Sequence, residues 1–270
     1  MKLVGFTKQK NGSYKESLPY NEQFTSVVQK RAIFFNMFNM YMEKDLAFNH
    51  HEINTHSTIE ETFNYKIRSE IDISCIKPYL SHHEKNIKID MVSTLLIYAY
   101  FMDKKITFPL LKKPFLRIGK LINLIYSPQG LSLNLDLDDM FLHLVYERIK
   151  KVNRYADVLL FEKSIVIKDK REGVPTAMVV PNYRKIDKST LYEDRDFIAE
   201  MNIVEETISS GEISHIYLVY PKHPNFKKHI NIKLPYQTKL TEDEYQVKVM
   251  PYSFSFCTKN TKQKKSMGQI

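Results

Sequence analysis

Three aspartates stand together where an alternating segment of the chain gives way to a helical one. They are Asp136, Asp138 and Asp139, with Asp157 and Glu162 further along. Clustered carboxylates can hold Mg²⁺ ions that stabilise the attacking and leaving oxygens in phosphodiester cleavage. A plainer interpretation is that Asp138 caps the helix and Asp139 complements its dipole. The sequence therefore leaves open a Mg²⁺-dependent nuclease with Asp136, Asp138, Asp139 and Glu162 as catalytic residues, and otherwise predicts no cofactor.

A second group of residues suited to chemistry is cationic and lies between residues 213 and 240. This window contains five lysines and three histidines but no acidic residue. Two apolar segments, 216–220 and 230–234, bracket a basic loop, which predicts a hairpin with positive charge and one aromatic ring at its tip. Lysines displace counterions from phosphates, and an aromatic ring can stack on an unpaired base. We therefore predict nucleic-acid contacts by Lys222, His223, Phe226, Lys227, Lys228, His229 and Lys233.

The same window has a plainer interpretation. A loop at the edge of a sheet often carries lysines, because their charge discourages edge-to-edge pairing with another sheet. The 213–240 segment is then a solvent-exposed loop with no ligand.

A basic stripe marks the helix predicted at 114–126. Lys113, Arg117 and Lys120 are spaced so that they share one face, and Lys112 precedes them. The order of elements over 87–137 is compatible with a winged helix, in which the basic helix enters the major groove of DNA. We therefore predict Lys112, Lys113, Arg117 and Lys120 as nucleic-acid contacts. Any surface helix of a basic protein can show the same stripe, so the pattern is not specific.

Two His-His-Glu triplets, which begin at His50 and His82, offer metal ligands. Side chains of adjacent residues diverge, so a single triplet rarely supplies two ligands to one metal. We expect exposed loop histidines and no metal site.

Several common catalytic motifs are absent from the sequence. The chain has seven glycines, and no two are spaced for a Walker A or dinucleotide-binding loop, which needs glycine for close approach to phosphate. It has no Gly-x-Ser-x-Gly elbow, no kinase signature and no zinc-finger spacing of Cys and His. No motif identifies a protein family, and the sequence favours a binding protein over an enzyme.

The elements that must position these residues predict an α+β fold. The N-terminal half is rich in helical patterns, including a Phe- and Met-rich helix at 21–44. Residues 131–137 alternate between apolar and polar, which is typical of a strand, and 158–167 and 174–180 flank a charged turn that predicts a hairpin. We predict a mainly helical region at 1–130, a mostly antiparallel sheet with helices at 131–257, and a disordered basic tail at 258–270.

Composition narrows the partner and the compartment. Lys and Arg total 40 against 31 Asp and Glu, and the resulting formal charge of +9 favours polyanionic partners. Cys75 and Cys257 are far apart in the sequence, which fits a reducing compartment. No apolar stretch approaches the roughly 18 residues of a membrane span. We expect a cytoplasmic protein that is not embedded in a membrane.

Together these features favour a nucleic-acid-binding protein, such as a replication, transcription or defence factor of a bacterium or mobile element. Lysine–phosphate contacts would dominate, so affinity should fall steeply with salt. Two alternatives stay open. One is the Mg²⁺-dependent nuclease, and the other is an assembly or scaffolding protein that uses the helix at 21–44 as a homo-oligomer surface.

Overall fold

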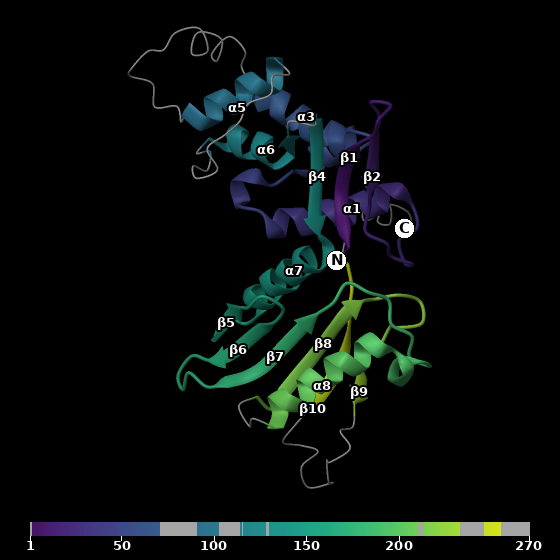
Figure 1. Cartoon of the computed structure of the whole chain (residues 1–270). Helices are drawn as coiled ribbons and strands as arrows, with labels where there is room; N and C mark the ends of the chain where they lie inside the picture. The colour runs from purple at the N-terminus through teal and green to yellow at the C-terminus, as the bar shows by residue number, and fades with distance from the viewer. Residues whose placement is uncertain are drawn as a thin grey trace, which may run out of the picture.

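The protein has two lobes, each built on its own β-sheet, with a helix between them (Figure 1). The computed structural model describes residues 2–70, 91–102, 114, 116–127, 130–209, 213–232 and 246–254. The combination of helices and sheets confirms the predicted α+β fold. Some sequence features lie outside the described residues, namely Cys75, Cys257, the triplet at His82 and the tail at 258–270.

The N-terminal lobe packs helices against a four-stranded antiparallel sheet of order β2-β1-β4-β3. The strands are β1 (Leu3–Lys8), β2 (Tyr14–Ser17), β3 (Tyr126–Ser127) and β4 (Gly130–Asp136). The helices are α1 (Val27–Tyr41), η1 (Lys44–Leu46), α2 (His50–Thr55), α3 (Ile59–Glu70), α5 (Met91–Met102) and α6 (Arg117–Ile125). The alternating segment predicted at 131–137 thus forms a strand, β4.

The helix α1 supplies a large part of the core of this lobe. It begins after Ser26, whose hydroxyl accepts a backbone N–H of the first turn. Its Phe34, Phe35 and Phe38 side chains are fully buried, and the Phe34 ring contacts the other two. Because these rings fill the protein's own core, they are not available as the homo-oligomer surface predicted for the helix at 21–44.

The helix α7 (Leu137–Val152) connects the two lobes and belongs to the cores of both. Its N-cap is Asp136, the last residue of β4, whose carboxylate accepts the Asp138 N–H at 2.8 Å. The sequence interpretation placed this cap at Asp138, two residues too late. Phe141 and other apolar side chains of α7 pack in one continuous cluster with α1 and with the second sheet. Because β4 pairs with β1, the chain passes from one sheet to the other at α7 rather than at residue 130.

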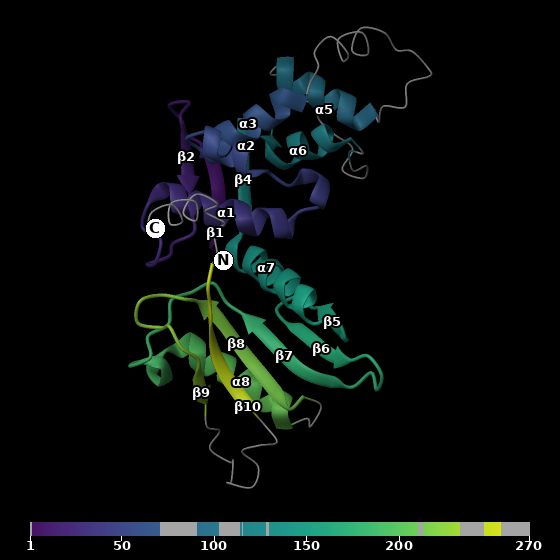
Figure 2. The same cartoon turned by 180° about the vertical axis from the view of Figure 1, so that it is seen from behind.

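The C-terminal lobe contains a six-stranded mixed sheet of order β5-β6-β7-β8-β10-β9. The strands are β5 (Ala156–Leu160), β6 (Ile165–Asp169), β7 (Pro175–Pro181), β8 (His215–Pro221), β9 (Ile230–Ile232) and β10 (Gln246–Tyr252). β7, β8 and β10 run parallel, whereas the other neighbours are antiparallel. α7 lies against one face, and α8 (Arg195–Ser209) with η2 (Leu191–Glu193) covers the other (Figure 2).

Of the two hairpins predicted in this lobe, one is confirmed and one is wrong. β6 and β7 pair across the predicted charged turn, where Gly173 adopts a φ of +68°. The segment predicted as one strand at 158–167 is divided between β5 and β6. The segments at 216–220 and 230–234 do not form a hairpin, because β10 lies between β8 and β9 and pairs with both. No helix in the described part of the chain is long and apolar enough to cross a membrane.

Candidate nucleic-acid interface

The basic side chains of α6, Arg117 and Lys120, form what we call the α6 stripe, and both contact carboxylates of the N-terminal lobe. Arg117 Nη2 lies 3.2 Å from Glu70 Oε1. Lys120 Nζ pairs with Glu43 and lies 3.3 Å from Asp45 Oδ2. The hydrogen bond to Glu43 raises the pKa of Lys120 above its ordinary value. The positive charges of Arg117 and Lys120 are therefore each matched by a carboxylate within the protein.

The remaining features of the predicted winged helix cannot be placed. Residues 103–113, which include Lys112 and Lys113, lie outside the described residues. α6 is followed by the short β3–β4 pair, and the winged helix stays a prediction.

The basic segment after β8 folds differently from an exposed hairpin tip. Phe226 is 2% exposed and His223 is 4% exposed, and their backbones pair across a tight turn. Phe226 belongs to the core beneath α8, so it cannot stack on a base as predicted. Lys227 and Lys228 are exposed, as is the neighbouring imidazole of His229.

The exposed cations of this segment make no ion pair with any residue that the structure describes. Lys222 is half-buried, and Lys233 lies outside the described residues. Of the residues predicted as contacts in this segment, those at 227–229 are therefore the ones exposed to a partner.

The carboxylates at the start of α7 lie near one another, and two of them accept backbone N–H groups that stabilise the fold. Asp136 caps α7, and Asp138 Oδ1 accepts the Tyr183 N–H at 2.8 Å. Burial raises the pKa of Asp139, with further contributions from Asp136 and, more weakly, from Glu162. Among the described residues, no group of three or more His, Cys, Asp or Glu side chains is placed to hold a metal ion. The geometry thus favours the capping interpretation of these aspartates over Mg²⁺-dependent cleavage.

A group of cations that sequence analysis did not single out lies where α7 ends and β6 turns into β7. We call it the α7 cluster, and its members are Lys150, Lys151, Arg154, Lys170 and Arg171. All five side chains are exposed, and none forms an ion pair with a described residue. Lys170 Nζ donates to the Arg154 carbonyl oxygen at 3.2 Å, which joins the turn to the end of the helix.

The β5–β6 register explains why these residues meet. Ala156 lies opposite Asp169, so the residues just before β5 face the residues just after β6. The Asp169 carboxylate accepts the backbone N–H groups of Arg171 and Glu172 at 2.7 and 3.1 Å, which shapes the turn. The sequence does not reveal this cluster, because residues 150–154 and residues 170–171 are separated in the chain by β5 and β6.

An exposed aromatic ring adjoins the α7 cluster. Tyr155 is 92% exposed and lies between Arg154 and the first residue of β5. Val152 beside it is 76% exposed. An exposed aromatic ring near cations that lack carboxylate partners can stack on an unpaired base while the cations neutralise the phosphates.

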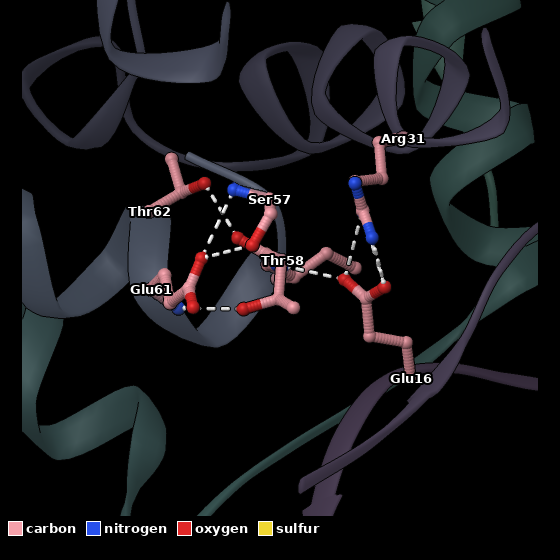
Figure 3. Close-up of polar contacts among 7 residues, drawn as sticks. Glu16, Arg31, Ser57, Thr58, Glu61 and Thr62 are labelled. Atoms are coloured by element: carbon pink, nitrogen blue, oxygen red, sulfur yellow. Dashed lines mark hydrogen bonds and ion pairs between the residues drawn. The ribbon is translucent and has the colours of Figure 1, made fainter. Parts of the chain in front are cut away.

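Another set of charges lies inside the N-terminal lobe and is fully paired (Figure 3). The Arg31 guanidinium donates to Glu16 at 2.7 and 3.1 Å, and the Ile59 N–H donates to the same carboxylate at 2.5 Å. The Arg31 and Glu16 side chains are only 16% and 13% exposed. Next to them, Thr58 accepts the Glu61 N–H at 3.1 Å and begins α3. This network ties β2, α1 and α3 together and offers no charge to a partner.

Comparison with known proteins finds similarity in structure but none in sequence families. No family model matches the sequence, and no curated protein matches it. A chain in a solved assembly from Thermococcus gammatolerans is similar in structure, with a TM-score of 0.59 and 11% sequence identity over 92% of this chain and 77% of that chain. The assembly is a half-complex of a tetradecamer, in which McrB AAA+ hexamers carry bound McrC. The two chains share a fold. At this identity the likeness shows nothing further about this chain.

Proposed function

We propose that this chain is a nucleic-acid-binding subunit of a larger protein assembly, in a replication, transcription or defence system of a bacterium or mobile element. The observation that carries the proposal is the α7 cluster, five exposed cations with no carboxylate partner in the described part of the chain. Phosphate neutralisation by such side chains releases counterions and supplies most of the affinity in sequence-independent binding. The overall charge of +9 acts in the same direction.

Membership of an assembly is supported by the structural neighbour. Its fold is found in a complex of McrB AAA+ hexamers with bound McrC, so the fold is compatible with a multi-subunit setting. Fold alone does not carry function from one protein to another, and this part of the proposal needs its own test. Purification of the tagged chain from its native cells, followed by mass spectrometry and size measurement, should recover a defined complex rather than the single chain.

The exposed residues 227–229 form a second, smaller contact in this proposal. β7 and β8 run parallel, so the turn before β7 and the segment after β8 lie at opposite ends of the sheet. One short nucleic-acid segment therefore contacts either the α7 cluster or Lys227 and Lys228. We assign the main site to the α7 cluster because it has more cations and an exposed ring beside it.

The test is a binding titration with fluorescently labelled duplex and single-stranded oligonucleotides at low salt. The proposal expects binding that weakens steeply as salt increases. A full chain that is folded by circular dichroism and binds neither oligonucleotide at low salt would overturn it.

A further inference from the structure

A cavity of about 130 Å³ lies where the C-terminal sheet meets the N-terminal lobe. It is formed partly by the residues that follow β7 and β8, and partly by residues 20–22 and the start of α7. β7 and β8 run parallel, so their carboxyl ends meet at this edge of the sheet, and Figure 1 shows both arrowheads directed toward the N-terminal lobe. The crevice outside the carboxyl ends of parallel strands is where α/β proteins most often bind ligands.

Three buried polar atoms that line this cavity lack a hydrogen-bond partner of good geometry, although the Asn21 and Tyr183 side chains lie close enough to each other to interact. They are Asn21 Nδ2, Tyr183 Oη and His223 Nδ1, in residues that are 4%, 3% and 4% exposed. Buried polar groups are nearly always hydrogen-bonded, because desolvation without a partner is costly. Three such atoms around one cavity indicate that a polar ligand completes it.

The other contacts of these side chains indicate which atom of each faces the cavity and whether it can donate or accept a hydrogen bond. Asn21 Oδ1 accepts the Gln23 N–H at 2.8 Å, so the amide nitrogen is the end that faces the cavity. His223 Nε2 lies 2.5 Å from the Ile186 carbonyl oxygen, which can only accept, so this nitrogen carries a hydrogen and Nδ1 is the ring nitrogen left for the cavity. Burial raises the pKa of Tyr183 well above its ordinary range, with the nearby Asn21 amide opposing the rise, so its hydroxyl is a donor.

The charge around the cavity is positive. Lys2 and Lys222 line it, and neither forms an ion pair with a described residue. The single carboxylate in the lining, Glu22, lies 2.7 Å from Lys185 Nζ and 3.9 Å from His223 Nδ1. The cavity is therefore lined by the donors of Asn21 and Tyr183, the Nδ1 atom of His223 and two lysines without a carboxylate partner among the described residues.

We propose that this cavity binds a phosphomonoester group. Asn21 Nδ2 and the Tyr183 hydroxyl donate to its oxygens, and Lys2 and Lys222 offset its charge. The proposal includes a neutral His223, whose Nδ1 accepts the P–O–H of a phosphomonoester monoanion. A phosphodiester or a sulfate cannot make this contact because neither carries that proton. The site is separate from the α7 cluster and does not depend on it.

The test is thermal unfolding of the full chain in inorganic phosphate, sulfate or chloride at matched ionic strength. A ligand near ten times its Kd should raise the Tm by about 3 °C for a chain of this size. We expect this shift with phosphate and less than half of it with sulfate. Equal shifts with the two anions would overturn the proposal.

Two variants locate the effect in the cavity. Tyr183→Phe removes a hydroxyl whose neighbour in the protein is the Asn21 amide, so the Tm without phosphate should change little, yet the phosphate shift should be lost. Lys222→Gln should also lose the shift. Tyr220→Phe is the matched control: its hydroxyl bonds to Glu200 outside the cavity, so the Tm should fall while the phosphate shift remains. A full phosphate shift in both Tyr183→Phe and Lys222→Gln would contradict the proposal.

A last experiment asks whether the phosphomonoester belongs to the end of a nucleic-acid strand or to a free small molecule. If the cavity receives the end of a nucleic-acid strand, a 5′-phosphorylated oligonucleotide should bind about tenfold more tightly than its 5′-hydroxyl counterpart, and Tyr183→Phe should abolish the difference. If it receives a free phosphorylated small molecule, inorganic phosphate should give the Tm shift while the two oligonucleotides bind equally. Both results support the cavity and differ only in the source.

Discussion

The α6 stripe and the α7 cluster are both rows of basic side chains on or beside a helix, and they differ in their surroundings. In the α6 stripe, Arg117 contacts Glu70, and Lys120 contacts two carboxylates of the 43–45 segment. In the α7 cluster, no described carboxylate lies within ion-pair distance of any of the five cations. A protein can offer to a partner only those cations that its own carboxylates do not neutralise. By this criterion the α7 cluster is available to a partner and the α6 stripe is not.

Removing charge from the α7 cluster should have the largest effect. The variant Lys150→Gln/Lys151→Gln/Lys170→Gln/Arg171→Gln loses up to four phosphate contacts, and its affinity for oligonucleotides should fall on the order of 100-fold at near-physiological salt. Fluorescence anisotropy measures the loss, and an unchanged Tm shows that the fold is intact. An affinity close to that of the wild type would mean that the cluster does not bind nucleic acid.

A paired, buried charge should affect stability and leave binding unchanged. Glu16→Gln keeps the shape of the side chain but removes the charge that holds Arg31 and the start of α3. We expect a loss of about 2 kcal/mol in the free energy of unfolding, which is typical of charged hydrogen bonds that are mostly shielded from solvent. Urea denaturation measures it. The oligonucleotide affinity of the folded variant should equal that of the wild type. A tenfold loss of affinity would contradict the claim that charges paired within the protein do not contribute to binding.

The exposed ring beside the α7 cluster should act on single strands alone. Tyr155→Ser removes a stacking surface and no charge, so single-stranded affinity should fall by about tenfold, the usual value of one stacked base. Duplex affinity should change by less than about twofold, since paired bases are not free to stack on the ring. Anisotropy titrations with both oligonucleotides decide the matter, and equal losses for the two would show that the ring acts by another route.

The smallest effect should come from the α6 stripe. Arg117→Gln/Lys120→Gln removes two cations that already contact carboxylates, so oligonucleotide affinity should change by less than about twofold. This variant is also the matched control for the charge removal in the α7 cluster. If its affinity fell as far as that of the cluster variant, ion pairing would not decide which cations bind.

Local patterns in the sequence predicted a good part of the fold. The alternation that produces β4 and the charged turn between β6 and β7 depend on neighbouring residues, and both formed as predicted. The cap of α7 was misplaced because Asp136 and Asp138 are both good cap residues, and only the end of β4 decides between them.

The candidate site was harder to predict because it depends on contacts distant in sequence. The partner of Lys120 on η1 is 75 residues away, and nothing near α6 indicates it. Phe226 looked exposed because the insertion of β10 between β8 and β9, which removes the hairpin, cannot be read from the segment itself. The α7 cluster was missed because its two halves meet only through the β5–β6 pairing.

The most direct test of the central claim is the salt dependence of binding, measured for the wild type and the two charge-removal variants together. On a plot of log affinity against log salt concentration, the cluster variant should have a slope shallower than the wild type by roughly 3 to 4, close to 0.9 for each lost contact. The α6 stripe variant should have the wild-type slope. Equal slopes for the wild type and the cluster variant would contradict the claim that the unpaired cations at the end of α7 bind phosphate.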